Sequence, residues 1–357
     1  MSTNFYIKKL SIKNFRAFAS LEIDSLKRVN VIGGFNGSGK TSLLETIFLA
    51  LDIKTPISIV KPILWRQLPQ GGENLRTLLP DEMSPGLVNM TTKDHSLRIE
   101  INYSTPSAQV LQTLTTHAQN NKFSGSSDVA STKRGIDVVC RIRDQIDQAF
   151  FVLPENDGFT ANVYTSRPRD IPTSQFIGNG AKASPSEIAQ SVSTIIQKRQ
   201  ISELLAFLSA IQPQVENLQI LQFKDGSNVF AQMRDGALLP IQFLGEGFVN
   251  LITVGAGLIT ANGGVLLMDE IDHTVHYSVV RMIWANISNL ANRQNCQIFV
   301  TSHSREAINN IAHGMKDAGN SSDFQYFRLE AHESKHAPIY YSADQLLDAE
   351  EFDVEIR

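Results

Sequence analysis

The sequence has few of the residues that mark secreted, metal-binding or membrane-spanning proteins. Its two cysteines, Cys140 and Cys296, lie far apart and match no metal-binding or redox spacing. The longest apolar run, from Phe248 to Ala261, is interrupted by Asn250 and two threonines and is shorter than the roughly 18 residues that a transmembrane helix needs. The first ten residues lack the apolar core of a secretory signal. These absences predict a soluble protein in a reducing cytoplasm, with no membrane association.

The chain also lacks the basic excess of a protein that coats nucleic acid, because its formal net charge is −4. The charge is uneven, since residues 1–40 are mainly basic and residues 323–357 are mainly acidic. Solvated faces of opposite charge would explain this pattern, and a local basic groove for DNA is the second interpretation. With 357 residues, 42% of them hydrophobic and 19% charged, the chain is an ordinary globular protein of two domains or one elaborated domain.

Glycines gather between a short apolar strand, Val29 to Ile32, and a helical pattern from Thr41 to Leu51. The loop between them reads Gly-Phe-Asn-Gly-Ser-Gly-Lys-Thr, and loops of this kind wrap phosphates with their backbone N–H groups. Lys40 is expected to reach the β- and γ-phosphates, and the Thr41 hydroxyl to bind Mg²⁺. The sequence therefore predicts a phosphate loop for ATP, although such a loop does not by itself exclude GTP. The residues expected to contact the nucleotide are Gly34, Asn36, Gly37, Ser38, Gly39, Lys40, Thr41 and Ser42.

Two later strands end in polar residues. The apolar strand Val265 to Met268 runs into Asp269 and Glu270, which is the arrangement that a Mg²⁺-dependent NTPase requires. Asp269 would hold the metal, and Glu270 would orient and polarise the attacking water. The strand from Gln297 to Thr301 is followed by His303, which at the carboxyl edge of the sheet could touch the γ-phosphate or that water. The predicted catalytic residues are Lys40, Glu270 and His303.

The remaining patterns predict a nucleotide-binding core that an inserted region divides. Two consecutive strand–helix repeats near the C-terminus indicate a parallel sheet, whereas Leu97–Tyr103 and Ile136–Leu153 resemble antiparallel strands. The polar stretch 104–134 is typical of a mobile insertion, and Ser184–Glu187 of the start of a small helical lobe. We divide the chain into an N-terminal half of the core (1–55), an inserted antiparallel and helical region (56–240) and a C-terminal half of the core (241–357).

A glycine pair, Gly245 and Gly247, opens the helix that follows Leu244, and it forms a weak anion-binding motif on its own. Together, these features resemble the RecF-, SMC- and OLD-like branch of ABC-type ATPases, and the residues that carry the resemblance are Asn14-Phe15-Arg16, the phosphate loop, Leu244 to Gly247, Asp269-Glu270 and Thr301-Ser302-His303. The chain is most similar to stand-alone bacterial ATPases of that branch, several of which are paired with a nuclease or another effector in phage-defence operons. The resemblance implies an α/β fold of the ABC head type, with a parallel core, an antiparallel subdomain and an inserted helical lobe.

The resemblance further implies a head-to-tail homodimer or larger homo-oligomer with composite ATP sites. Gly245, Glu246 and Gly247 would form the signature loop of this family, which closes on the ATP held by a second copy. His303 would be the switch histidine. The stretch 272–276 would communicate across the dimer. The serine usual in this signature is Gly245 here, which leaves only backbone donors and puts tight ATP-driven closure in doubt.

Two residues that the resemblance suggests are less well defined by the sequence. Gln175, with Gln67 as second choice, is the candidate for the glutamine that senses Mg²⁺ in this family. Arg16 either contacts the nucleotide or packs in a turn.

These observations favour a Mg²⁺-dependent ATPase switch in antiphage defence, with a separate nuclease or toxin as its effector. A DNA repair or chromosome-maintenance ATPase that binds DNA directly is the alternative. A built-in nuclease is disfavoured, because the acidic tail after His303 is short and resembles a solvated edge. The energy subunit of a transporter is disfavoured by the Asn14-Phe15-Arg16 start and the degenerate signature.

Overall fold

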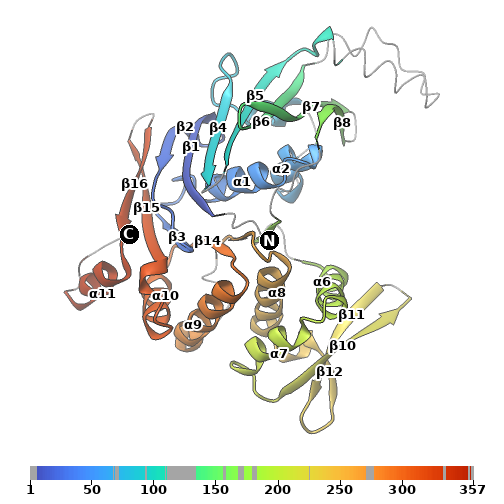
Figure 1. Cartoon of the computed structure of the whole chain (residues 1–357), viewed down its shortest axis with the longest axis vertical. Coiled ribbons are helices and arrows are strands. Elements are labelled where there is room, and N and C mark those ends of the chain that lie inside the picture. The colour runs from blue at the N-terminus through green and yellow to red at the C-terminus, as the bar shows by residue number, and fades with distance from the viewer. Residues whose placement is uncertain are drawn as a thin grey trace.

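A computed structural model describes most of the chain, and Figure 1 shows how its elements are arranged. The described residues are 6–66, 68, 72–92, 95–108, 110, 134–155, 158–167, 173–178, 183–224, 226–270, 277–332, 335–352 and 354. Across these stretches, no helix is both long and apolar enough to cross a bilayer. Most of the predicted mobile insertion, the alternative glutamine Gln67 and the stretch 272–276 lie outside the described residues.

The described strands form one large sheet of thirteen strands and a second sheet of three. The strand order in the large sheet is β8-β7-β6-β5-β4-β1-β2-β16-β15-β3-β14-β13-β9. Its strands are β1 (Ile7–Phe15), β2 (Phe18–Ile23), β3 (Val29–Gly33), β4 (Gly86–Thr92), β5 (Ser96–Ser104), β6 (Gly135–Ile142), β7 (Gln145–Glu155), β8 (Gly158–Ser166), β9 (Ser174–Ile177), β13 (Val265–Met268), β14 (Gln297–Thr301), β15 (Phe324–His332) and β16 (Lys335–Tyr341).

Strand direction changes along this sheet. The strands β8, β7, β6, β5, β4, β1 and β2 pair antiparallel in that order, whereas β15, β3, β14, β13 and β9 pair parallel. In Figure 1 the antiparallel strands fill the upper part of the molecule, and α8, α9 and α10 lie below the parallel strands. The predicted mixed sheet, with a parallel core and an antiparallel subdomain, is therefore confirmed.

The parallel strands separate two apolar layers, because successive side chains of a strand point to opposite faces. In β13, Leu266 and Met268 belong to the layer formed with α8 (Glu246–Thr260), α9 (Tyr277–Arg293) and α10 (Arg305–Asp317). Val265 and Leu267 belong to the opposite layer, which contains the buried side chains of α1 (Lys40–Leu51). If the side chains go on alternating one residue past the end of β13, Asp269 lies on the α1 side of the sheet.

A lobe of two helices and the small sheet packs against α8. It consists of α6 (Pro185–Gln197), α7 (Ile201–Ser209), β10 (Val215–Phe223), β11 (Gly226–Met233) and β12 (Leu238–Pro240). The predicted helix start is confirmed, because the Glu187 N–H donates to Ser184 Oγ (3.3 Å) and the Ser184 N–H donates to Glu187 Oε2 (2.7 Å). A Cβ at Gly255 of α8 would lie 2.8 Å from side-chain atoms of Leu204 and Phe207, so a larger residue there would require these buried side chains of α7 to shift.

The middle of the chain shares its sheet with both predicted halves of the core. Strand β4 pairs with β1, and β9 joins the parallel core beside β13. The boundaries at residues 55 and 240 stay a prediction. The remaining elements among the described residues are α2 (Lys61–Trp65), α3 (Gly72–Arg76), α11 (Ala343–Glu351) and the 3₁₀ turns η1 (Pro56–Ile59), η3 (Ile241–Leu244) and η5 (Ser321–Asp323).

Candidate active site

The predicted phosphate loop connects β3, which ends at Gly33, with α1, which begins at Lys40. Gly34, Gly37 and Gly39 have φ angles of 131°, 80° and 90°, a region that favours glycine. A Cβ at Gly34 would lie 2.7 Å from the backbone oxygen of Leu329 in β15. At Gly39 it would lie 2.8 Å from the ring of Phe18. The strand–loop–helix context is therefore confirmed, and close packing makes glycine necessary at two of its positions.

Lys40 lies across this loop with its side chain almost completely buried. Its Nζ donates to the backbone oxygens of Gly34 (2.8 Å) and Phe35 (2.9 Å). The Ser38 N–H also donates to the Phe35 oxygen, at 3.1 Å. These bonds hold the ammonium group at the mouth of the loop, beside the N-terminal end of α1, where the helix dipole favours an anion.

Three side chains connect the start of α1 to the ends of β13 and β14. The Thr41 hydroxyl lies within hydrogen-bond distance of both Asp269 oxygens, at 3.2 and 3.0 Å. The Thr301 hydroxyl donates to Asp269 Oδ1 at 2.6 Å and accepts the Glu270 N–H at 2.8 Å. The Asp269 N–H donates to Ile177 O in β9 at 2.8 Å. The structure thus brings together the predicted metal residues Thr41 and Asp269 and fixes the backbone of Glu270.

Glu270 adopts a φ of 54°, which turns the chain away from the strand direction directly after Asp269. Glu270 is half-buried at the carboxyl edge of the sheet, the position at which open α/β sheets bind ligands. Side-chain oxygens such as those of Thr41 and Asp269 are the donors that Mg²⁺ prefers. Within the part of the chain that the structure describes, no group of three His, Cys, Asp or Glu residues could hold a metal. The donor set fits an ion that takes one or two protein ligands and completes its shell with phosphates and water.

His303 follows β14 at the same edge and is exposed. The residues around it are fixed by local bonds, because the Ser304 N–H donates to Ser302 Oγ (3.2 Å) and Ser304 Oγ caps α10 through the Ala307 N–H (3.2 Å). The predicted position at the carboxyl edge is confirmed. The contact of His303 with the γ-phosphate or the attacking water stays a prediction.

The signature residues Gly245, Glu246 and Gly247 begin α8, next to the lobe. Gly245 has φ 94° and ψ 159°, and its N–H donates to Gln242 O at 3.2 Å. Apart from Gly245 itself and its two chain neighbours, no described residue has an atom within 4 Å of the place where its Cβ would be, so the loop faces open space. The predicted glycine opening of this helix is confirmed, and its role toward a second copy stays a prediction.

Gln175 is not placed with the metal residues. It lies on β9 level with Leu266, three positions before the level of Asp269. It also faces the α8 side, since a Cβ at Gly257 of α8 would lie 4.0 Å from Gln175 Cβ, whereas Asp269 reaches Thr41 on the α1 side. The residue level with Asp269 is Gly178 by continuation of the register. The structure therefore does not bring Gln175 together with Thr41 and Asp269, and its role as the Mg²⁺-sensing glutamine stays a prediction.

Arg16 lies in the turn between β1 and β2 with φ 56°, and its N–H donates to Leu78 O at 2.8 Å. Its guanidinium group forms a buried ion pair with Glu45 of α1, with Nε 3.0 Å from Oε2. Arg66 binds the other oxygen of Glu45 at 2.6 Å. The packing interpretation of Arg16 is thus the one that the contacts support, and a nucleotide contact stays a prediction.

Glu45 was not among the predicted residues, although the sequence carries a signal for it. It lies one helical turn after Thr41, between the apolar residues Leu44 and Ile47, and is 3% exposed. An acid in the apolar stripe of a helix requires a buried cation as partner. The role of Thr301 between Asp269 and Glu270 was also missed, because a threonine at the end of a strand has no distinctive pattern.

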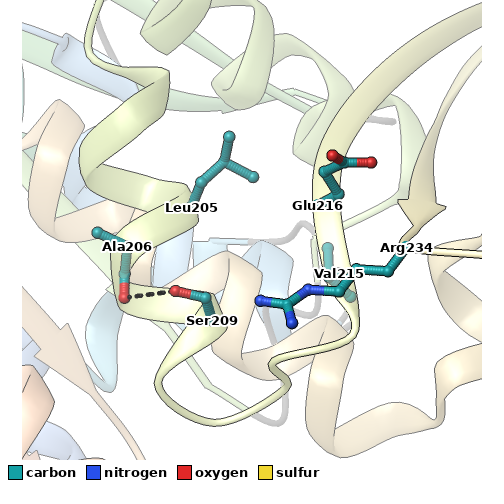
Figure 2. Close-up of a pocket in the computed structure, with 6 residues that line it drawn as sticks. All are labelled: Leu205, Ala206, Ser209, Val215, Glu216 and Arg234. Atoms are coloured by element: carbon teal, nitrogen blue, oxygen red, sulfur yellow. Dashed lines mark hydrogen bonds between the residues drawn. The ribbon is translucent and has the colours of Figure 1, made fainter.

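A separate cavity lies in the lobe, between α7 and the start of β10. It is lined by Leu205, Ala206, Ser209, Val215, Glu216 and Arg234, none of which belongs to the phosphate loop or its partners. Figure 2 shows the guanidinium group of Arg234 extending toward Ser209, whose hydroxyl donates to Ala206 O at 3.2 Å.

Comparisons with known proteins agree with this geometry. A family model described as an AAA domain matches residues 9–239, which is more than half of the chain. The chain belongs to this AAA-domain family. A second model, described as an AAA ATPase domain, matches residues 181–308. The AAA-domain chain is thus an ATP-hydrolysing protein, as predicted.

Among curated proteins, an ATP/GTP phosphatase of Helicobacter pylori is 20% identical over 95% of this AAA-domain chain and 96% of its own length. A DNA replication and repair protein RecF of Clostridium acetobutylicum is 51% identical over 43 residues, which are 12% of each chain. Among solved structures, an SMC head bound to the C-winged helix domain of ScpA is 14% identical, covers 96% of this chain and 99% of its own, and has a TM-score of 0.49.

Proposed function

We propose that this AAA-domain ATPase is a Mg²⁺-dependent switch that dimerises on ATP, hydrolyses it, and passes the change of state to a separate effector in bacterial antiphage defence. The observation that carries the proposal is the chain of hydrogen bonds from Thr41 through Asp269 and Thr301 to the backbone of Glu270. It connects the phosphate loop to the residue that orients water.

In this site Lys40 binds the β- and γ-phosphates, and the glycines of the loop let backbone N–H groups approach them. Thr41 and Asp269 are the residues that would hold Mg²⁺, which supplies positive charge to the phosphate oxygens when bound. Glu270 orients the attacking water through its carboxylate, and His303 lies at the same edge to contact the γ-phosphate. Phosphoryl transfer needs mainly the positioning of the reacting groups and the stabilisation of charge. Lys40, the Mg²⁺-binding residues, Glu270 and His303 together provide both.

Dimerisation is supported by the place of the signature loop, which begins α8 with Gly245 facing open space. A helix N-terminus with an open glycine can offer backbone N–H groups to the phosphates of ATP held by a second copy. We place the protein in the cytoplasm, where two free and buried cysteines stay reduced. The separate nuclease or toxin effector rests on the family resemblance alone.

The test measures oligomeric state by light scattering, with and without Mg²⁺ and ATP, together with phosphate release. Glu270→Gln keeps the size of the side chain and removes the carboxylate, so ATP should lock this variant into a dimer or larger assembly with hydrolysis lost. The matched control is Glu216→Gln, the same change at an exposed position of β10, which should behave as wild type. An assembly unchanged by ATP, together with continued hydrolysis by Glu270→Gln, would refute the proposal.

The alternative is a DNA repair or chromosome-maintenance ATPase that binds DNA directly, and the short match to a protein named for DNA replication and repair favours it. The two functions differ in what the purified ATPase does alone. A direct DNA binder should retard duplex DNA in a gel-shift assay in the presence of ATP. Its affinity for DNA should fall steeply as the salt concentration rises to about 200 mM. A defence switch should leave DNA unbound and protect cells from phage only when its effector is expressed with it.

A further inference from the structure

Two of the most exposed large apolar side chains lie at the two loops that form the proposed composite site. Phe35 of the phosphate loop is 74% exposed, and Phe243, which precedes the signature glycine, is 79% exposed. Single exposed apolar residues are common on proteins and need no explanation. These two differ because each stands in a loop assigned to the nucleotide.

Both phenylalanines lie on backbone that hydrogen bonds or buried neighbours hold in place. The Phe35 oxygen accepts the Lys40 ammonium group and the Ser38 N–H, at 2.9 and 3.1 Å. Phe243 lies in the turn η3, which is anchored by the fully buried Ile241. The same turn is tied to β11 by the two side-chain hydrogen bonds that join Gln242 and Asn228, at 3.3 and 3.1 Å. An aromatic ring presented in this way loses little conformational freedom on contact with a partner.

The two loops share one more property. Each phenylalanine precedes by two positions a glycine with positive φ, Gly37 at 80° and Gly245 at 94°. Apart from each glycine itself and its chain neighbours, no described residue has an atom within 4 Å of the Cβ position of either glycine. By contrast, the neighbouring glycines Gly34 and Gly39 have atoms within 3 Å of theirs. Each loop therefore presents an open Phe-x-Gly surface that no described part of its own chain covers.

We propose that Phe35 of one protomer packs against Phe243 of a second copy of this chain when ATP closes the dimer. This inference rests on the proposed dimer and names the side chains that close it. In a two-fold dimer the contact occurs twice, because each copy contributes both surfaces. The ring pair gains from edge-to-face or offset contact and buries two exposed apolar groups beside the nucleotide. It supplies closure that the signature lacks, since Gly245 stands in place of the usual serine.

The first test measures the dissociation constant of the ATP-locked dimer in the Glu270→Gln background. Phe35→Ala and Phe243→Ala should each weaken the dimer by about tenfold or more, because each removes a buried aromatic contact at both symmetric sites. The matched control is Phe352→Ala, since Phe352 is 75% exposed and follows α11, far along the chain from both loops. It should leave the dimer unchanged.

The second test is disulfide trapping. Cys140 and Cys296 are fully buried and free, so they give little background. The double variant Phe35→Cys/Phe243→Cys should form a covalent dimer under mild oxidation only when Mg²⁺ and ATP are present. Each single variant should form no covalent dimer, because in the proposed dimer residue 35 of one copy faces residue 243 of the other and not its own counterpart.

The outcomes separate the inference from the function on which it rests. If Glu270→Gln dimerises with ATP but neither alanine change weakens the dimer and no covalent dimer forms, the aromatic contact is wrong and the switch stands. If Phe35→Ala weakens binding of a fluorescent ATP analogue to the monomer as much as it weakens the dimer, Phe35 contacts the nucleotide and the inference fails. If Glu270→Gln never dimerises, both fail.

Discussion

Thr301→Val is the substitution that most directly tests how the site is held together. The Thr301 hydroxyl is fully buried, donates to Asp269 Oδ1 at 2.6 Å and accepts the Glu270 N–H at 2.8 Å. Valine has almost the same shape but can neither donate nor accept. The change therefore removes both bonds, leaves the Glu270 N–H without this acceptor, and releases one constraint on the Asp269 carboxylate.

The expected magnitude follows from these two bonds. A buried group left without its partner costs about 1–3 kcal/mol, so we expect the free energy of unfolding to fall by about 2 kcal/mol. If a similar energy of about 2 kcal/mol is lost from positioning in the transition state, the rate of hydrolysis falls about 30-fold. The Mg²⁺ concentration for half-maximal activity should also rise, because Asp269 loses a bond that orients its carboxylate.

The assays are phosphate release over a Mg²⁺ titration and urea unfolding followed by the fluorescence of Trp65 and Trp284. Thr301→Ser is the control, since it keeps the hydroxyl and removes only a methyl group. It should retain most of the activity. Wild-type rates and Mg²⁺ dependence in Thr301→Val would show that the hydroxyl does not position Asp269 or Glu270, and the reasoning would be refuted.

Two other predictions concern buried charge and buried thiols. Glu45→Ala removes the partner of Arg16, whose side chain is only 10% exposed. Urea unfolding should show that the free energy of unfolding falls by about 3 kcal/mol. A loss below about 1 kcal/mol would contradict a buried ion pair. Burial raises the pKa of the Cys140 and Cys296 thiols to about 12. Neither thiol should therefore react with a disulfide reagent at pH 8 until the protein is unfolded. Rapid reaction of the native protein would count against this packing.

The sequence allowed the nucleotide site to be predicted because its constraints are local. Backbone geometry near the phosphates demands glycine, so the loop before Lys40 is recognisable without any knowledge of the fold. The meeting of Thr41 and Asp269 was also predictable, since the carboxyl ends of parallel strands share one edge of the sheet. Both inferences need only the order of elements along the chain.

Reasoning from sequence was weakest where the answer depends on strand register or on the pairing of distant segments. Gln175 lies on the strand next to β13, but the register places it beside Leu266 and on the opposite face from Asp269. The pairing of β15 with β3 was not predicted, because nothing in the segment Phe324–His332 indicates a parallel neighbour almost at the other end of the chain. Hydrophobic pattern specifies which face is buried and leaves the neighbour undetermined.

The strand order has a consequence for synthesis of the protein. Strand β3 (Val29–Gly33), whose residues are all buried, lies between β14 (Gln297–Thr301) and β15 (Phe324–His332), so the ribosome makes both neighbours long after it. At about 5–20 residues per second, the apolar strand stays without its neighbours for tens of seconds in the nascent chain. The backbone of Leu329 that borders Gly34 emerges just as late. A nascent chain therefore has no assembled phosphate loop to bind ATP until both β14 and β15 have been made.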